Sequence, residues 1–380
     1  MQIRVLSLED FRVYREALLQ FEARTTVIVG DNAQGKTSIL EAICALARTK
    51  SQRTNRDDEL IRWGEDQTIV SGRFERGVRG PVSLRMVMMT PEAARFTGAP
   101  QKQFALNDEP INGSRAIIGE ITVVVFSPDD LALAKGDPGG RRRFMNVAIG
   151  QIQPLHLADA QQYRRALRQR GELLGMIAER RASEDQLNAW DEQVAKHGAE
   201  IVKARGKYIR DLAEAAKRIH HELTGGAEEL SVEYRSNVWE GDGGEAVALQ
   251  GTMLQKLDEK RPQEINLRRT LTGPHRDDIQ LRVDEKDLRK FGSQGQQRTA
   301  VLALRLAEAE VARTRLDETP LVLLDDCLSE LDESRAGRVL EQAGDKTQLI
   351  ITTTHLTEPL RRDTDAAVYS VHDGVLTAEA

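Results

Sequence analysis

The sequence lacks the features that would place the protein in a membrane. No run of about 18 apolar residues occurs, and a membrane-spanning helix needs roughly that length. The first residues, MQIRVLSLEDF, carry charges within the first ten positions and contain no long apolar core, so we expect no signal peptide. These two absences predict a cytoplasmic protein with no membrane partner.

Cysteine is also scarce. The two cysteines, Cys44 and Cys327, lie in apolar stretches at no spacing typical of metal ligands, so we expect two buried reduced thiols rather than a disulfide. The seven histidines do not cluster at ligand spacings, and the adjacent His220 and His221 point to different sides of an expected helix. The sequence therefore predicts neither a disulfide nor a histidine metal site.

The chain lacks the net positive charge that would by itself indicate nucleic-acid binding, because its formal net charge is −6. One segment departs from this balance: residues 141–170 hold seven arginines and a single acid, Asp159. A solvated helix face and a phosphate-binding surface both fit such a segment, and charge alone does not separate them. The seven are Arg141, Arg142, Arg143, Arg164, Arg165, Arg168 and Arg170.

Elsewhere the chain has a strand-rich beginning, a helical middle and an alternating end. The first thirty residues predict strands, the last of them TTVIVG, and a helical pattern starts at Lys36. From Arg141 to about Thr224 the periodicity is helical, with almost no glycine. The last third alternates helical stretches with the strands PLVLLD, TQLIITTTH and AAVYSVHDGVLT. This order predicts two α/β portions that flank a helical insertion.

GDNAQGKT fits the phosphate-loop pattern G-x-x-x-x-G-K-[ST] at every fixed position. The stretch follows an expected strand and opens an expected helix, where backbone N–H groups and the helix N-terminus bind phosphates. Lys36 should contact the β- and γ-phosphates, and Thr37 should hold Mg²⁺. The predicted nucleotide-binding residues are Gly30, Asp31, Asn32, Ala33, Gln34, Gly35, Lys36 and Thr37.

A second acidic motif, LVLLDDCLSELD, begins at Leu321. Asp325 ends an expected buried strand and could reach Mg²⁺ directly or through water, and Asp326 follows where a water-activating carboxylate would lie. The alternative to a catalytic role is an acidic turn after a core strand. That alternative explains a single Asp better than the two consecutive acids, Asp325 and Asp326. If Lys36 and Asp325 belong to one nucleotide-binding site, both ends of the chain must fold into one domain. The helices predicted between them would then project as an arm.

The stretch GSQGQQRT opens the helix before that acidic strand. Ser293 can cap the helix, and Gly295 keeps its backbone accessible. A helix N-terminus with a free hydroxyl is a second anion site. The simplest use of both sites is a head-to-tail pair of chains, in which Ser293 of each chain covers the nucleotide on the phosphate loop of the other.

Together, the phosphate loop, S-x-G-Q-Q-R and D-D-x-L-S-E-L-D resemble ATP-binding-cassette ATPases of the structural-maintenance-of-chromosomes and Rad50 type. FSPDDLALAKGDPGGRRRF, YRRALRQR and LTGPHRDD narrow this to a resemblance to the RecF family of bacterial recombination mediators, from about residue 3 to about residue 356. The resemblance implies the α/β fold class. Residues 1–135 and 265–380 would form an ABC-type P-loop ATPase head, and residues 136–264 an inserted helical arm.

The resemblance implies an ATP- and Mg²⁺-dependent DNA-binding protein for replication, recombinational gap repair and the SOS response. Such proteins pair on ATP, bind double-stranded DNA at single-strand junctions, work with RecR and RecO to place RecA, and hydrolyse ATP slowly.

The resemblance also implies roles for single residues. Ser293, Gly295 and Gln296 would form the signature, and Asp325 would bind Mg²⁺. Catalytic roles would fall to Lys36, Asp325, Asp326 and His355. Most relatives have Glu where this chain has Asp326, and the shorter side chain suits a slow switch. Ser329 to Asp332 resembles the loop that crosses the dimer interface.

The resemblance also makes Arg141, Arg142 and Arg143 candidates for DNA contact, the alternative being ion pairs with acids of the arm. Asn146 stands where the family usually has Asp, and no obvious glutamine senses Mg²⁺. GPHRDD fits a functional role or a turn that fastens the arm equally well.

Three other classes fit less well. A transporter ATPase keeps its signature closer to the phosphate loop and has no helical insertion. A chromosome-organising clamp needs long heptad coiled coils, which are missing here. A P-loop kinase gives SQGQQR no role.

Overall fold

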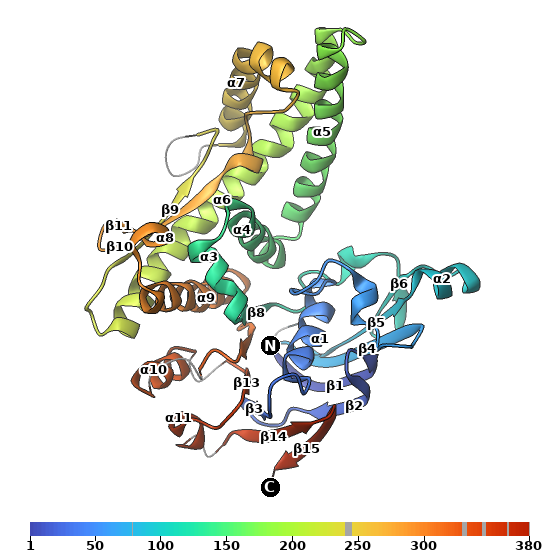
Figure 1. The fold of residues 1–380 in the computed structure, drawn as a ribbon, viewed down its shortest axis with the longest axis vertical. Coiled ribbons are helices and arrows are strands. Elements are labelled where there is room, and N and C mark those ends of the chain that lie inside the picture. Colours follow the sequence, from blue (N-terminus) through green and yellow to red (C-terminus); the bar gives the residue numbers. More distant parts are fainter. Residues whose placement is uncertain (78, 240–244, 329–332, 344–346, 363–364, 380) are drawn as a thin grey trace. The chain divides into compact units, whose positions relative to one another are not determined.

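The computed structural model describes the chain except residues 78, 240–244, 329–332, 344–346, 363–364 and 380. Its contacts divide the chain into two compact units, which can be followed by colour in Figure 1. Unit 1 comprises Met1–Asp130, Glu222–Thr224 and Leu302–Ala380; unit 2 comprises Leu131–His221 and Gly225–Val301. Both ends of the chain therefore contribute to unit 1. Residues 265–301, predicted as part of the head, belong to unit 2 in this division.

The first sheet of unit 1 has the strand order β15-β14-β3-β13-β12-β8. All neighbours from β14 to β8 are parallel, and β15 joins β14 as an antiparallel hairpin. The runs TTVIV, LVLLD and LIITT are almost entirely buried, as expected for parallel strands covered on both faces. The strands are β3 (Thr25–Val29), β8 (Val123–Phe126), β12 (Leu321–Asp325), β13 (Leu349–Thr353), β14 (Ala367–His372) and β15 (Val375–Glu379).

The second sheet of unit 1 is antiparallel, with the order β2-β1-β4-β5-β6-β7. Its inner strands alternate buried and accessible residues, the pattern of a sheet packed on one face. The strands are β1 (Gln2–Phe11), β2 (Tyr14–Gln20), β4 (Gln67–Glu75), β5 (Val82–Met89), β6 (Lys102–Leu106) and β7 (Glu109–Ile111).

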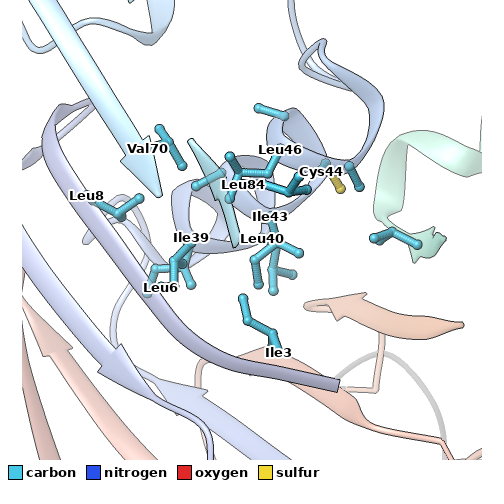
Figure 2. Packing of buried hydrophobic residues seen from close by; sticks show 14 of the residues in the cluster. Ile3, Leu6, Leu8, Ile39, Leu40, Ile43, Cys44, Leu46, Val70 and Leu84 are labelled. Atoms are coloured by element: carbon cyan, nitrogen blue, oxygen red, sulfur yellow. The ribbon is translucent and has the colours of Figure 1, made fainter. Parts of the chain in front are cut away.

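The helix α1 (Lys36–Arg48) lies in the core of unit 1. Nearly all of its residues are buried, because apolar side chains of both sheets pack around it: Ile3, Leu6 and Leu8 on the antiparallel sheet, for example, and Ile28 and Leu323 on the parallel one. Figure 2 shows this packing around Ile39, Leu40 and Ile43. Because α1 is buried along nearly its whole length, the core fixes where the helix begins.

Among the described residues, three further α-helices lie wholly in unit 1: α2 (Pro91–Thr97), α10 (Glu333–Ala343) and α11 (Glu358–Arg362). The stretch Ser329 to Asp332, predicted to cross a dimer interface, lies outside the described residues. None of the helices in the described part of the chain is long and apolar enough to cross a membrane.

Unit 2 is mainly helical, as the periodicity between Arg141 and Thr224 predicted. Its first long helix begins where Pro138 takes the first helical position and the Asp137 carboxylate accepts the N–H of Gly139 at 2.5 Å. The three-stranded antiparallel sheet has the order β11-β10-β9. Two helices, α6 and α9, have residues in both units. The elements are α3 (Ala132–Lys135), α4 (Pro138–Ile152), α5 (Leu155–Ala178), α6 (Leu187–Thr224), β9 (Leu230–Arg235), α7 (Ala246–Leu267), β10 (Asp278–Val283), β11 (Lys286–Asp287), α8 (Leu288–Phe291) and α9 (Gln294–Leu316).

Candidate nucleotide-binding site

The predicted phosphate loop joins the carboxyl end of β3 to the start of α1, as the motif requires. Its glycines have no space for a side chain. A Cβ on Gly30 would lie 2.5 Å from the Val371 carbonyl oxygen, and one on Gly35 would lie 2.6 Å from Val13. Gly35 also has φ 109°, a conformation that other residues rarely adopt. Packing therefore restricts both positions to glycine, and backbone conformation adds a second restriction at Gly35.

The side chain of Lys36 lies along the inside of this loop. Its ammonium group donates to the carbonyls of Gly30 at 2.5 Å and Asp31 at 2.8 Å. Burial lowers the pKa of Lys36, while the nearby charges of Asp326, Asp325 and Asp31 raise it. A buried cation surrounded by backbone acceptors and acids is suited to binding phosphate oxygens.

The predicted magnesium ligands are brought together across the sheet. Because β3, β13 and β12 are parallel neighbours, their carboxyl ends share one edge. There the Thr37 hydroxyl donates to Asp325 Oδ1 at 2.8 Å, and Thr352, on β13, donates to the same oxygen at 2.7 Å. Burial raises the pKa of Asp325, although the hydrogen bonds from Thr352 and Thr37 lower it. A cation bound at this carboxylate would therefore offset the free-energy cost of burying its negative charge.

These donors fit Mg²⁺. One hydroxyl and one carboxylate are hard oxygen ligands, and Mg²⁺ commonly takes only one or two protein ligands, completing its shell with waters and nucleotide phosphates. No group of three or more His, Cys, Asp or Glu side chains in the described part of the chain could hold a metal. The site therefore suits a cation that arrives with phosphates rather than one held in a protein cage.

Two further predicted residues lie at the same edge. Asp326 is half-buried and has φ 48°, and its N–H donates to the Thr352 carbonyl at 3.0 Å. The left-handed backbone turns the chain away from β12 directly after Asp325. His355 follows β13 with an exposed side chain, and its Nδ1 lies 3.1 Å from the Thr354 hydroxyl. Asp325 ends β12 and Asp326 follows it, His355 follows β13, and Lys36 and Thr37 open α1 after β3. Unit 1 therefore assembles these predicted residues.

The predicted signature lies in unit 2, at the first turn of α9. Ser293 Oγ accepts the N–H of Gln296 at 3.2 Å, while Gln296 Oε1 accepts the N–H of Ser293 at 2.9 Å. This reciprocal arrangement is a capping box, and it confirms Ser293 as the helix cap. Ser293, Gln294 and Gly295 are exposed, so the helix N-terminus is open to an anion from outside.

The three arginine candidates for DNA contact differ in accessibility. Arg141 is buried and forms a bidentate ion pair with Asp278, at 2.6 and 2.8 Å. Arg141 thus has an internal partner, the alternative that the sequence left open for it, and releasing it would leave Asp278 without that partner. Arg142 donates to the Asp277 carbonyl at 2.8 Å and is partly accessible, whereas Arg143 is exposed.

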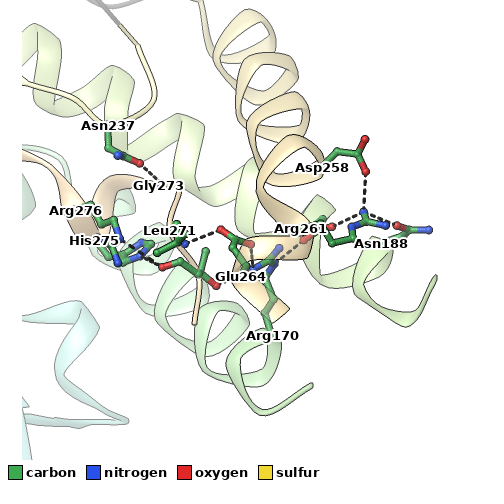
Figure 3. Close-up of polar contacts among 12 residues, drawn as sticks. Arg170, Asn188, Asn237, Asp258, Arg261, Glu264, Leu271, Gly273, His275 and Arg276 are labelled. Atoms are coloured by element: carbon green, nitrogen blue, oxygen red, sulfur yellow. Dashed lines mark hydrogen bonds and ion pairs between the residues drawn. The ribbon is translucent and has the colours of Figure 1, made fainter. Parts of the chain in front are cut away.

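Other arginines of the basic segment are exposed on α5. Arg168 lies four positions after Arg164 and three after Arg165, so its side chain neighbours both of them on the surface of that helix. Arg170 is different, because it is fully buried against Asp191 and Glu264, as Figure 3 shows for Glu264. The basic segment therefore divides into internal ion pairs and an exposed stripe.

GPHRDD mainly serves to fasten unit 2. The ring of His275 lies 2.7 Å from the Tyr163 hydroxyl. The N–H of Gly273 donates to Asn237, a contact that Figure 3 shows. Asp277 is buried, accepts from the N–H of Asn237 at 2.7 Å and pairs with Arg205. Of the two interpretations left open by the sequence, these contacts favour the structural one.

Asn146, the departure from the family pattern, keeps a role as a hydrogen-bond acceptor. Its side-chain oxygen accepts from Arg205 at 3.1 Å and lies 3.1 Å from His156 Nε2. Burial lowers the pKa of His156 to about 4, which favours the neutral ring beside this arginine. An uncharged amide can therefore replace a carboxylate here.

Three contributors to the loop were missed in the sequence. Tyr14 donates its hydroxyl to the Gly35 carbonyl at 3.1 Å, and Thr352 holds Asp325. The turn between β14 and β15 also contacts the loop, since the N–H of Asp373 donates to Gln34 Oε1 at 2.6 Å. The hydroxyl-rich end of TQLIITTTH was a usable signal for Thr352, because hydroxyl groups buried at a strand end need hydrogen-bond partners.

The comparisons with known proteins agree with this geometry. Residues 2–377 match the family described as RecF/RecN/SMC N terminal domain. The chain is 37% identical over 382 residues to the DNA replication and repair protein RecF of an Exiguobacterium species, covering 100% of both chains. It is also 37% identical to the protein of that name from Geobacillus kaustophilus, covering 98% of each.

A solved structure of "the recombination mediator protein RecF-ATP in RecFOR pathway" superposes with a TM-score of 0.89. It is 28% identical in sequence, and the match covers 100% of this chain and 97% of the other. This likeness confirms the predicted fold class, a mixed α/β ATPase head with a helical arm. From the family model, the relatives and the fold together, the chain belongs to the RecF family, within the RecF/RecN/SMC group.

Proposed function

We propose that the protein is an ATP-dependent DNA-binding protein of replication, recombinational gap repair and the SOS response, in which slow ATP hydrolysis acts as a switch. The observation that carries this proposal is the contact between Thr37 of the phosphate loop and Asp325 of β12. With Thr37 and Asp325 as the Mg²⁺ ligands and Lys36 beside them as the phosphate-binding cation, the site would have the set of groups that a nucleoside triphosphate requires.

In the proposed site, ATP binds with its β- and γ-phosphates on the loop N–H groups and Lys36. The ammonium group, now on the carbonyls of Gly30 and Asp31, exchanges these acceptors for phosphate oxygens. Mg²⁺ bound by Thr37 and Asp325 would neutralise phosphate charge. The RecF structure described with ATP supports this assignment for a relative that shares the fold.

The proposed switch is a head-to-tail pair of chains. The exposed Ser293 and the N–H groups of the first turn of α9 form an anion site that serves the γ-phosphate bound by the partner chain. Each ATP then joins two chains, and loss of the γ-phosphate removes one half of the contact. Asp326 orients the attacking water, and His355 contacts the γ-phosphate.

DNA would be held by the exposed arginines rather than by Arg141. The proposed surface consists of Arg143 on α4 together with Arg164, Arg165 and Arg168 on α5. Exposed guanidinium groups bind phosphates without reading bases, which suits a protein that recognises a junction between single- and double-stranded DNA rather than a sequence. The RecFOR pathway named for the relative supports RecR and RecO as partners.

The pairing is tested with Lys36→Met and Ser293→Arg. Lys36→Met should reduce ATP affinity at least tenfold, because it removes the buried cation, and should therefore block pairing. Ser293→Arg should leave ATP affinity of the single chain unchanged and abolish ATP-dependent pairing, measured by light scattering after chromatography. The exposed Ser183→Arg is the matched control and should pair normally. Normal pairing of Ser293→Arg would refute the sandwich.

Asp325→Asn and Asp326→Asn form a second test with opposite expectations. Because burial raises the pKa of Asp325, its charge destabilises the fold at pH 7 in the absence of nucleotide. Asp325→Asn should thus raise the Tm by a few degrees. This gain should shrink as the pH falls, because the wild-type carboxyl then becomes protonated. The same substitution should abolish Mg²⁺-dependent ATP turnover. Asp326→Asn should change the Tm little, preserve pairing and stop turnover. Wild-type turnover in Asp326→Asn would exclude its role.

The DNA surface is tested by the salt dependence of binding. Arg165→Ala with Arg168→Ala should weaken binding to a gapped duplex and reduce the slope of log K against log salt by about 2, roughly 0.9 for each lost phosphate contact. The control is Arg180→Ala with Arg181→Ala, which removes two exposed arginines after α5. An equal change in both double variants would mean that only net charge matters, and would contradict the surface.

A further inference from the structure

Glu228 contacts the signature from outside its helix. It lies in the connection between α6 and β9, within unit 2, with its side chain 25% exposed. Gln296 Nε2 donates to Glu228 Oε1 at 3.0 Å, and the other carboxylate oxygen lies 3.8 Å from His220 Nε2. The proposed nucleotide sandwich gives Glu228 no part, yet Glu228 binds one of the signature residues directly.

This contact fixes which way the Gln296 amide faces. A carboxylate can only accept hydrogen bonds, so it selects the orientation in which the amide NH₂ points to Glu228. The amide oxygen then points back to the helix start, where it accepts the N–H of Ser293 at 2.9 Å. Turning the amide over would set its NH₂ against the Ser293 N–H and its oxygen against the carboxylate, so both hydrogen bonds would be lost.

The backbone next to Glu228 is itself held in place. The N–H of Glu229 donates to Asp284 Oδ1 at 2.9 Å, and the N–H of Asp284 donates to the Glu229 carbonyl at 3.0 Å. One residue later, Leu230 pairs with Val283 in the sheet. The carboxylate is therefore presented to Gln296 from an anchored position, which lowers the entropy cost of keeping the contact.

We propose that Glu228 is a positioning residue for the signature. By orienting Gln296 it holds the capping box, and the capping box holds Ser293 and the exposed N–H groups of the first turn in the conformation that receives the partner's γ-phosphate. The inference rests on the proposed function, because it gives Glu228 an effect on pairing only if the signature completes the site of a second chain. Glu228 itself touches no nucleotide.

The test uses three substitutions that differ in what they offer Gln296. Glu228→Gln keeps an acceptor and should pair with ATP almost as the wild type does. Glu228→Ala removes the acceptor and should weaken ATP-dependent pairing about tenfold, the effect of losing one charge-assisted hydrogen bond. Glu228→Lys presents only donors, reverses the amide and should weaken pairing further. ATP affinity of the single chain should stay unchanged in all three, since the phosphate loop belongs to unit 1.

Two additional readouts separate positioning from general loss of structure. Hydrogen exchange at the Ser293 and Gln296 amides should accelerate in Glu228→Ala and return toward the wild-type rate in Glu228→Gln. Glu229→Ala is the matched control, because that side chain pairs only with the exposed Lys217 among the described residues, and it should pair normally with ATP.

The outcomes distinguish this inference from the function on which it rests. If Glu228→Ala pairs normally while Ser293→Arg does not, the positioning role is wrong and the sandwich stands. If Ser293→Arg also pairs normally, the sandwich is wrong and the inference falls with it. Equal loss in Glu228→Ala and Glu229→Ala would assign the effect to the whole connection and overturn the specific role of Glu228.

Discussion

The hydrogen bond between Thr37 and Asp325 is the contact on which the arrangement of the site depends. It joins residues 288 positions apart, so it can form only if both ends of the chain enter one sheet. The parallel order β3-β13-β12 achieves this by bringing three strand ends to one edge. The first and last parts of the chain must fold together in unit 1 before a phosphate site exists, and the buried α1 fixes the loop against that sheet.

The same arrangement leaves unit 1 with charges that are costly without a ligand. Lys36 and Asp325 are both buried. Burial lowers the pKa of Lys36 and raises the pKa of Asp325, so it favours the neutral form of each group. A magnesium nucleotide would supply the opposite charge to both groups, so binding and stability are linked. Such a site is expected to be less stable empty than its packing alone would allow, which is a common property of functional sites.

The sequence predicted the parts of the site that local rules govern. The loop, the acidic strand end and the Ser293 cap could each be predicted from a short pattern. The reason is that a glycine turn, a buried strand and a capping box each depend on residues that are close together in the sequence. Arg141 could not be judged in this way, since its partner Asp278 lies 137 positions away and a basic run does not reveal its ion pairs. Glu228 likewise gave no signal, because its link to Gln296 depends on how a connection folds back onto α9.

The central claim is that each nucleotide is shared between two chains, with Lys36 from one and Ser293 from the other. The most direct measurement is ATP-dependent pairing, by light scattering, of Lys36→Met mixed with Ser293→Arg, each unable to pair alone. A mixed pair has one site that lost both residues and one intact site, so the account predicts pairing and ATP turnover only in the mixture. No pairing in the mixture at saturating ATP would contradict a site shared between chains.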